Sequence, residues 1–158
     1  MSRKLTVCVL PSLFEPSRLV GGTAVAIDVL RATTTVAHAF HNGARSIIPC
    51  ESIEEAIAQR STAGRTASSV NDEILLGGER GGEPISGFDL GNSPSEWSRP
   101  VVADREIAFT TTNGTQALLK CAWAERIVTG AFVNLSAVVD FLITDQRPIH
   151  LVCAGTVG

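Results

Sequence analysis

The sequence lacks three features that would each indicate a class of protein: a cluster of lysine and arginine, a long apolar run, and a repeated or low-complexity tract. Affinity for nucleic acids comes from concentrated positive charge. A formal net charge of −3 without a basic cluster therefore argues against a nucleic-acid-binding surface and leaves single phosphates as ligands. The N-terminal segment MSRKLTVCVLPSLFEP holds an apolar run that proline cuts short. This run is too short for a signal peptide or a membrane span, so we expect a cytoplasmic protein without membrane contact.

Cysteine is scarce, and its spacing is unlike that of a disulfide framework. Cys8, Cys50, Cys121 and Cys153 are far apart, and three of them lie beside β-branched or aliphatic runs. Such positions suit buried thiols in a reducing compartment. The cysteine pattern therefore agrees with a cytoplasmic location.

Short β-branched runs alternate along the chain with stretches of helical period. A length of 158 residues with 44% hydrophobic content predicts one domain over residues 1–158. The alternation predicts a layered α/β fold whose strands are mostly buried on both faces. Helical spacing covers residues 117–122 and 135–143, and Ser52 with Glu55 forms a capping box before another helix. The predicted strands are Leu5–Leu10, Thr23–Asp28, Arg45–Cys50, Glu73–Gly78, Glu106–Thr111, Glu125–Gly130 and Ile149–Gly155.

The segment GGERGGEPISGFDLGNSP, from Gly77 to Pro94, concentrates charge where the backbone is least regular. Its glycines and prolines predict a shaped loop. The alternative is a solvated surface connection. However, a loop of this length in a compact domain is more often functional, and the apolar Ile85, Phe88 and Leu90 argue against full disorder.

Polar residues follow the second predicted strand, where the ligand crevice of an α/β fold is expected. Asp28 ends this strand, directly before VLRATTT opens a helix that contains Arg31. Asp28 either caps that helix or faces a ligand. A positive charge in a first helical turn opposes the helix dipole, so Arg31 requires an anionic partner, which is either Asp28 or a ligand.

The fifth predicted strand runs into TTTNGTQALL, where hydroxyls, an Asn-Gly turn and the amides of a helix start come together. This combination suits a phosphate or a sulfonate. The alternative is an N-capped turn in which Asn-Gly serves only geometry. Neither Walker nor GxGxxG spacing is present to support the anion site independently. The candidate anion-binding residues are Thr111, Thr112, Asn113, Gly114 and Thr115.

Three carboxylates and two arginines are placed to converge: Asp28, Glu79 and Asp89 with Arg31 and Arg80. Oxygen ligands from separate loops are what a Mg²⁺ ion shared with a phosphate requires, because it keeps several waters and takes only one or two protein carboxylates. The arginines would neutralise the remaining phosphate charge. Alternatively, Glu79 and Arg80 form a surface ion pair of little energetic weight.

Four motifs, in their order and spacing, resemble those of a known family: IDVLRATTT, GGERGGEPISGFDLGNSP, TTTNGT and VCAGTVG. Over essentially its whole length the chain resembles the 2-phosphosulfolactate phosphatase family of the ComB type. The resemblance implies a three-layer α/β/α fold with a mostly parallel, mixed central sheet. It also implies a Mg²⁺-dependent phosphoric monoester hydrolase that converts 2-phospho-3-sulfolactate to 3-sulfolactate and phosphate, as in coenzyme M biosynthesis. Family members usually continue well beyond the CAGT segment, so we expect the domain to be incomplete at its C-terminus.

In this interpretation Asp28 and Glu79 hold the metal, and both are catalytic together with Arg31 and Arg80. Substrate binding falls to Arg31, Arg80, Asp89, Asn92 and the turn residues Thr111, Thr112, Asn113, Gly114 and Thr115. The nucleophile stays open between water, Asp28 and Cys153, and the oligomeric state, including a homo-oligomer, stays open as well. The alternative function is a binder of a small phosphorylated or sulfonated metabolite. Mg²⁺-dependent phosphate release separates the two.

Overall fold

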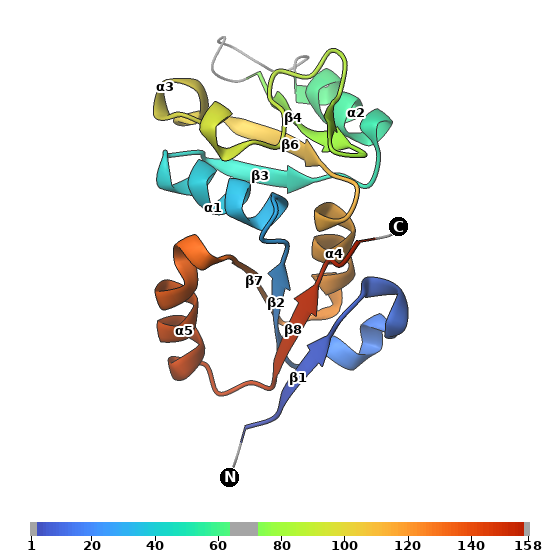
Figure 1. Ribbon diagram of the computed structural model, residues 1–158, viewed down its shortest axis with the longest axis vertical. Coiled ribbons are helices and arrows are strands. Elements are labelled where there is room, and N and C mark those ends of the chain that lie inside the picture. The colour runs from blue at the N-terminus through green and yellow to red at the C-terminus, as the bar shows by residue number, and fades with distance from the viewer. Residues whose placement is uncertain (1–2, 64–72, 157–158) are drawn as a thin grey trace.

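The computed structural model describes residues 3–63 and 73–156, and its strands form two four-stranded sheets, one above the other in Figure 1. The first sheet has the order β1-β8-β2-β7 and is parallel throughout. The second has the order β3-β6-β4-β5, and its pairing is parallel except for β5, which is antiparallel to β4. The strands are β1 (Leu5–Cys8), β2 (Thr23–Ile27), β3 (Ser46–Pro49), β4 (Leu75–Arg80), β5 (Glu83–Pro84), β6 (Glu106–Thr110), β7 (Arg126–Gly130) and β8 (Ile149–Cys153).

Helices cover both faces of each sheet. In the first sheet the core cluster of one face includes residues of α4, and that of the other includes residues of α5. In the second sheet α1 packs on one face and α2 on the other. The three-layer α/β/α arrangement with mostly parallel, mixed strand pairing is therefore confirmed. The helices are α1 (Ala32–His41), α2 (Ile53–Ala63), α3 (Arg99–Val102), α4 (Gly114–Lys120) and α5 (Leu135–Thr144), with the 3-10 turns η1 (Pro11–Leu13), η2 (Pro16–Leu19), η4 (Pro94–Glu96), η5 (Cys121–Trp123) and η6 (Phe132–Asn134).

The division into two sheets is a feature that the sequence does not predict. The chain leaves the first sheet after β2, builds the second through α1, and returns to the first through α4. Hydrophobic periodicity identifies a strand but not its partner, because pairing depends on contacts far apart in sequence. The assignment of the whole chain to one domain stays a prediction.

All seven predicted strands are present, but the segment from Gly77 to Pro94 is more regular than expected. Its first four residues continue β4, and β5 pairs back onto β4. Gly78 has a φ of +144°, and a Cβ atom there would lie 1.9 Å from the carbonyl oxygen of Thr110. Glycine therefore lets β4 approach β6 where any other side chain would clash.

The expected capping box before α2 is half formed. The backbone N–H of Glu55 donates to Ser52 Oγ at 3.1 Å, but the Glu55 carboxylate accepts from the N–H of Glu51 at 2.7 Å rather than from Ser52. All four cysteines are free thiols, and Cys8, Cys50 and Cys121 are buried.

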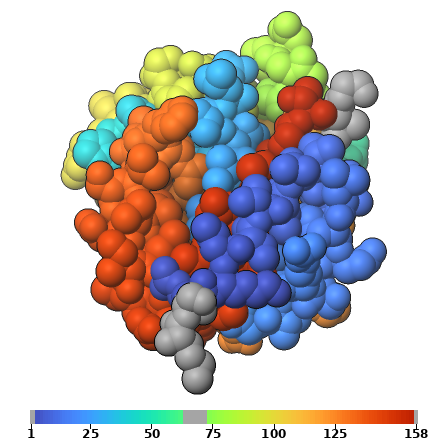
Figure 2. Space-filling view, turned by 60° about the horizontal axis from the view of Figure 1, so that its bottom comes forward, coloured from blue at the N-terminus to red at the C-terminus, as the bar shows by residue number. Residues whose placement is uncertain are grey.

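The expectation that strands are buried on both faces is wrong for the edges of the first sheet. Leu5 and Val7 of β1 are 60% and 57% exposed, and Ile127 of β7 is 46% exposed. Figure 2 views the molecule from the side of the N-terminal segment, which is blue, with α5 in orange and atoms of β8 in red between them.

Among the described residues, every helix falls short of the length and apolar content that crossing a bilayer requires.

Candidate functional site

Four strands drawn from both sheets end around one cavity of about 390 Å³. Asp28 follows β2 and Thr156 follows β8 in the first sheet, while Glu79 lies on β4 and Thr112 follows β6 in the second. β2 runs parallel to β8, and β4 runs parallel to β6, so the carboxyl ends of these strands gather polar groups, as in other open α/β folds. The lining residues are Asp28, Leu30, Arg31, Glu79, Gly81, Gly82, Asn92, Thr112, Asn113 and Thr156.

Glu79 is a buried carboxylate held by three hydrogen bonds. Thr112 donates its backbone N–H to Oε1 at 2.6 Å and its hydroxyl to Oε2 at 2.9 Å, and the N–H of Gly82 donates to Oε2 at 2.7 Å. Its side chain is only 7% exposed. Three hydrogen bonds fix the orientation of this carboxylate, so Glu79 is a positioned group in the cavity wall.

Asp28 is the second carboxylate of the cavity, and its surroundings favour the neutral form. Burial, followed by the negative charge of Glu79, raises the pKa of Asp28, against the lowering effects of the Ala32 backbone N–H and of Arg31. The loop is anchored by Thr33, whose hydroxyl oxygen accepts from the N–H of Asp28 at 2.9 Å. Asp28 and Glu79 both line this cavity.

Arg31 directly precedes α1 and lines the cavity beside Asp28. Within the part of the chain that the structure describes, no carboxylate lies within ion-pair distance of its guanidinium. Its positive charge acts on Asp28 from a greater separation. Arg31 is thus placed to meet an anionic ligand that enters the cavity.

The TTTNGT segment forms the predicted strand-to-helix turn between β6 and α4. Thr111 and Thr115 bind each other: each backbone N–H donates to the other hydroxyl oxygen at 3.0 Å. A Cβ atom at Gly114 would lie 2.6 Å from Asp28 Oδ2, so glycine is needed for this close approach. Of the candidate anion-binding residues in this turn, Thr112 and Asn113 line the cavity, while the backbone N–H groups of Thr111, Thr112 and Thr115 already donate to protein oxygens.

Asn92 lines the same cavity and has an unsatisfied oxygen. The residue is 6% exposed, and its Oδ1 is buried without a hydrogen-bond partner. Its backbone is fixed, since Thr35 Oγ1 donates to the Asn92 carbonyl at 3.1 Å. A buried acceptor without a donor costs about 1–3 kcal/mol, and among the described residues no donor reaches Asn92 Oδ1, so this oxygen is available to a ligand.

A second cavity, of about 530 Å³, adjoins the first and shares Thr112, Asn113 and Thr156 with it. Lys120 lines this second cavity, and its Nζ lies 5.2 Å from the centroid of the Phe14 ring. Ser12 and Gln116 add polar groups to its wall. The two cavities together offer two cationic side chains on either side of Asn113.

The predicted residues Arg80, Asp89 and Cys153 do not line the cavity of Asp28 and Glu79. Arg80 follows Glu79 on β4, and its guanidinium donates to Thr110 Oγ1 at 2.6 Å. Asp89 pairs with Arg60 and accepts from the N–H of Leu76 at 2.8 Å. Cys153, the last residue of β8, does not line either cavity. Arg80 stays outside the cavity of Asp28 and Glu79 because it follows Glu79 on β4, and successive residues of a strand point to opposite faces.

A family model described as 2-phosphosulpholactate phosphatase matches residues 8–158. The chain belongs to this family. Relatives named "probable 2-phosphosulfolactate phosphatase" include a Clostridium perfringens strain SM101 protein that is 37% identical over 155 residues, which are 98% of this chain and 61% of the relative. A Thermotoga petrophila protein of the same name is 45% identical over 136 residues, 86% of this chain and 55% of the relative. The chain thus spans about three-fifths or less of the length of these relatives.

In this family member, Lys120, Gly82 and Thr156 are cavity residues that were not named individually from the sequence. Lys120 is one of only two lysines, and a single lysine at a helix end has many ordinary explanations. Gly82 contributes a backbone N–H, which sequence patterns rarely identify. Thr156 follows a predicted strand, and only its position after β8 would have pointed to the crevice.

Proposed function

We propose that the protein is a Mg²⁺-dependent phosphatase that hydrolyses 2-phospho-3-sulfolactate to 3-sulfolactate and phosphate, a reaction of the coenzyme M biosynthesis type. The observation that carries the proposal is the cavity in which Asp28 and Glu79, from different sheets, lie beside Arg31. The names of the relatives support the choice of substrate. The partner is thus a small phosphorylated and sulfonated metabolite rather than nucleic acid or membrane. A cytoplasmic location is supported by the four free thiols.

The cavity fits a divalent cation through Asp28, Glu79 and Asn92. The described residues contain no group of three or more His, Cys, Asp or Glu side chains that could hold a metal, but Mg²⁺ needs no such group because it retains waters and binds substrate phosphate. A cation would relieve the repulsion that helps to raise the pKa of Asp28. It would also give the orphaned Oδ1 of Asn92 a partner. Carboxylate and amide oxygens are the ligands that Mg²⁺ prefers.

When bound, Mg²⁺ would neutralise charge on the phosphate oxygens. Arg31 donates its guanidinium hydrogens to the same phosphate, whose charge shifts as the ester P–O bond breaks and the new P–O bond forms. Asn113 lines the same cavity and would help to orient the substrate. Water and Asp28 remain the candidates for the group that attacks phosphorus, since Cys153 lies outside the lining.

The adjoining cavity accommodates the second anionic end of the substrate. The phosphate and the sulfonate of 2-phospho-3-sulfolactate lie on neighbouring carbons, and the two cavities share Asn113 and Thr112. With the phosphate beside Arg31, the sulfonate reaches toward Lys120. A compact ammonium suits a sulfonate as a point charge.

The test combines phosphate release from 2-phospho-3-sulfolactate with thermal unfolding of the same samples, each with and without Mg²⁺. We expect release only with Mg²⁺. The ion at 100 times its Kd should add about 2.7 kcal/mol to the free energy of unfolding. Asp28→Asn should abolish both effects.

The metal-free Asp28→Asn protein provides a second readout. Because the pKa of Asp28 is raised in the folded state, its ionisation removes stability as pH rises above the ordinary value of 3.8 through the raised value. The neutral asparagine avoids this loss, so the variant should unfold at a higher temperature than the parent at pH 7. Stabilisation by Mg²⁺ and substrate without phosphate release would indicate a binder. A parent that Mg²⁺ does not stabilise would mean that the metal site is misplaced.

A further inference from the structure

One face of the first sheet is only half covered. α5 packs over β2 and the edge strand β7, where Val138 and Leu142 cluster with Val25 and Val128. Beside the helix, β8 and the edge strand β1 carry Leu151 and Leu5 on the same face, and Leu5 is 60% exposed. The opposite face of the same sheet is closed by α4, η2 and η5.

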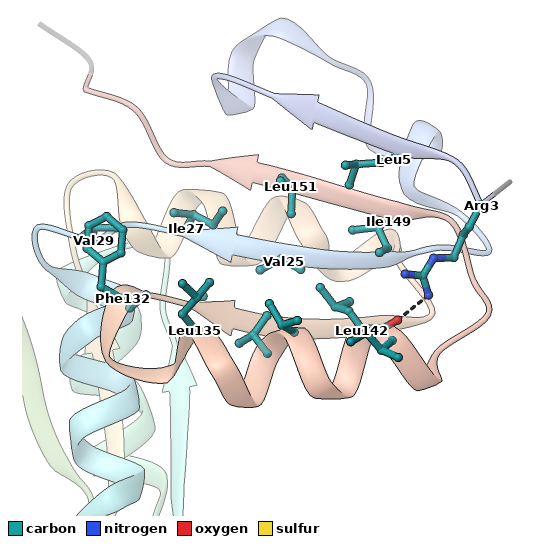
Figure 3. A pocket seen from close by; sticks show the side chains of 15 residues that line it. Arg3, Leu5, Val25, Ile27, Val29, Phe132, Leu135, Leu142, Ile149 and Leu151 are labelled. Carbon is teal, nitrogen blue, oxygen red and sulfur yellow. Dashed lines mark hydrogen bonds between the residues drawn. The ribbon is translucent and has the colours of Figure 1, made fainter.

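The uncovered part forms an apolar groove of about 400 Å³, shown in Figure 3. Its floor comes from β1, β8 and β2 and its wall from α5. Arg3 is the one ionisable side chain among its lining residues, and its guanidinium is already bound to the carbonyl oxygens of Leu142 and Asp145 at one end. The groove therefore offers an occupant apolar contact and almost no polar recognition.

α5 contributes a partly exposed apolar stripe to the wall of the groove. Leu135, Val139 and Ile143 recur at intervals of four residues and are 56%, 43% and 66% exposed. Residues four apart share one side of a helix, so this stripe continues the apolar wall outward from the groove. A monomeric surface rarely leaves so many large apolar side chains together.

The part of the sheet that the groove leaves uncovered is about as wide as one helix. Two neighbouring strands span about 10 Å, which is also the diameter of a helix with its side chains. In a three-layer fold each outer helix covers about this width of sheet. Here α5 occupies one such position, and no helix of residues 3–63 and 73–156 covers β1 and β8 on this face.

We propose that this groove is the docking site of an amphipathic helix that the family's longer members carry in the part of their chain that this one does not span. The relative from Clostridium perfringens extends beyond the matched region by 39% of its length, since the match covers 61% of it. This length suffices for further helices of the fold. The helix inserts apolar residues between α5 and β1 and keeps its polar face in solvent.

The experiment uses synthetic peptides of about 25 residues, long enough for several helical turns, that together cover the unmatched part of the Clostridium perfringens relative. Each peptide is titrated against this chain by fluorescence anisotropy, and its helix content is followed by circular dichroism. We expect one region to bind with gain of helix. Leu5→Lys and Ile143→Lys should each weaken its binding about tenfold or more, because each places a charge in the apolar contact.

Leu13→Lys is the matched control, since Leu13 is 66% exposed but lies on η1, away from the groove. It should leave peptide binding unchanged. Sedimentation velocity of the chain alone gives the competing outcome. A dimer that Leu5→Lys dissociates would overturn the proposal and assign the groove to a second copy of the chain. Absence of binding by every peptide, or binding that both lysine variants leave intact, would also overturn it.

Discussion

Arg31 and Arg80 carry the same charge in very different surroundings. Arg31 faces the cavity of the two carboxylates, whereas Arg80 is engaged by Thr110 and by the carbonyl oxygens of Glu79 and Glu51. A guanidinium that is already satisfied contributes to stability, while one that faces a ligand cavity is available to a phosphate. The two positions therefore predict different consequences of the same substitution.

We expect Arg31→Ala to lower kcat about a hundredfold, since a charged hydrogen bond that strengthens in the transition state is worth roughly 3 kcal/mol. Arg31→Lys should recover only part of the rate, because it supplies charge without the bidentate fork. The measurement is Mg²⁺-dependent phosphate release by protein whose fold is checked by circular dichroism.

Arg80→Ala serves as the comparison. The sequence alone assigns Arg80 the same catalytic role as Arg31. The contacts of Arg80 predict instead that its removal mainly lowers the stability of the protein. A hundredfold loss of turnover in folded Arg80→Ala, together with a near-parental rate in Arg31→Ala, would place the phosphate on the other side of β4.

At the scale of elements, the turn between β6 and α4 positions Thr112 in the wall of the cavity. The buried hydroxyl of Thr115 accepts from the Thr111 N–H at 3.0 Å and donates to the Thr111 carbonyl at 2.8 Å. This local closure places Thr112 where it can bind both oxygens of Glu79. The turn thus links the second sheet to the proposed metal site.

Thr115→Val should therefore destabilise the protein by about 1–3 kcal/mol, because it keeps the shape but leaves the buried Thr111 amide without an acceptor. Thr115→Ser retains the hydroxyl and should cost less. Urea unfolding followed by circular dichroism gives both values. Equal stability of the valine and serine variants would show that the hydrogen bonds do not hold the turn.

At the scale of the whole molecule, the first sheet depends on polar groups buried between its strands and loops. His150 on β8 is 2% exposed, and its Nδ1 lies 2.6 Å from Thr6 Oγ1 on β1. Burial, with smaller contributions from Lys4 and Arg18, lowers the pKa of His150. Asp145 accepts a hydrogen bond from the Thr23 hydroxyl, which, together with the hydrogen bonds and charge of Arg147, lowers the pKa of Asp145 to about 2.

These shifts predict acid sensitivity in two stages. A histidine whose folded pKa is lowered favours unfolding once pH falls below its ordinary value of 6.5, because the unfolded chain then binds more protons. Asp145 contributes stability above 3.8 that is lost as pH falls toward about 2. We expect the free energy of urea unfolding to decrease from pH 7 to pH 5 in the parent and to change less in His150→Gln.

His41→Gln is the matched control, since His41 is exposed on α1. It should retain the parental pH dependence between pH 7 and pH 5. A parental slope in His150→Gln would show that some other group governs acid unfolding in this range.

The sequence by itself determined the strands, the turn at Asn113 and the polar residues that follow strands, because periodicity, glycine and local hydrogen bonding act within a few residues. It thereby identified Asp28, Arg31 and Glu79, which share one cavity. Only the tertiary structure decided that the strands divide into two sheets, that Arg80 leaves the cavity and that Lys120 lies beside it. Strand partners and the face on which a side chain lies depend on contacts between residues far apart in the chain, and no local pattern records them.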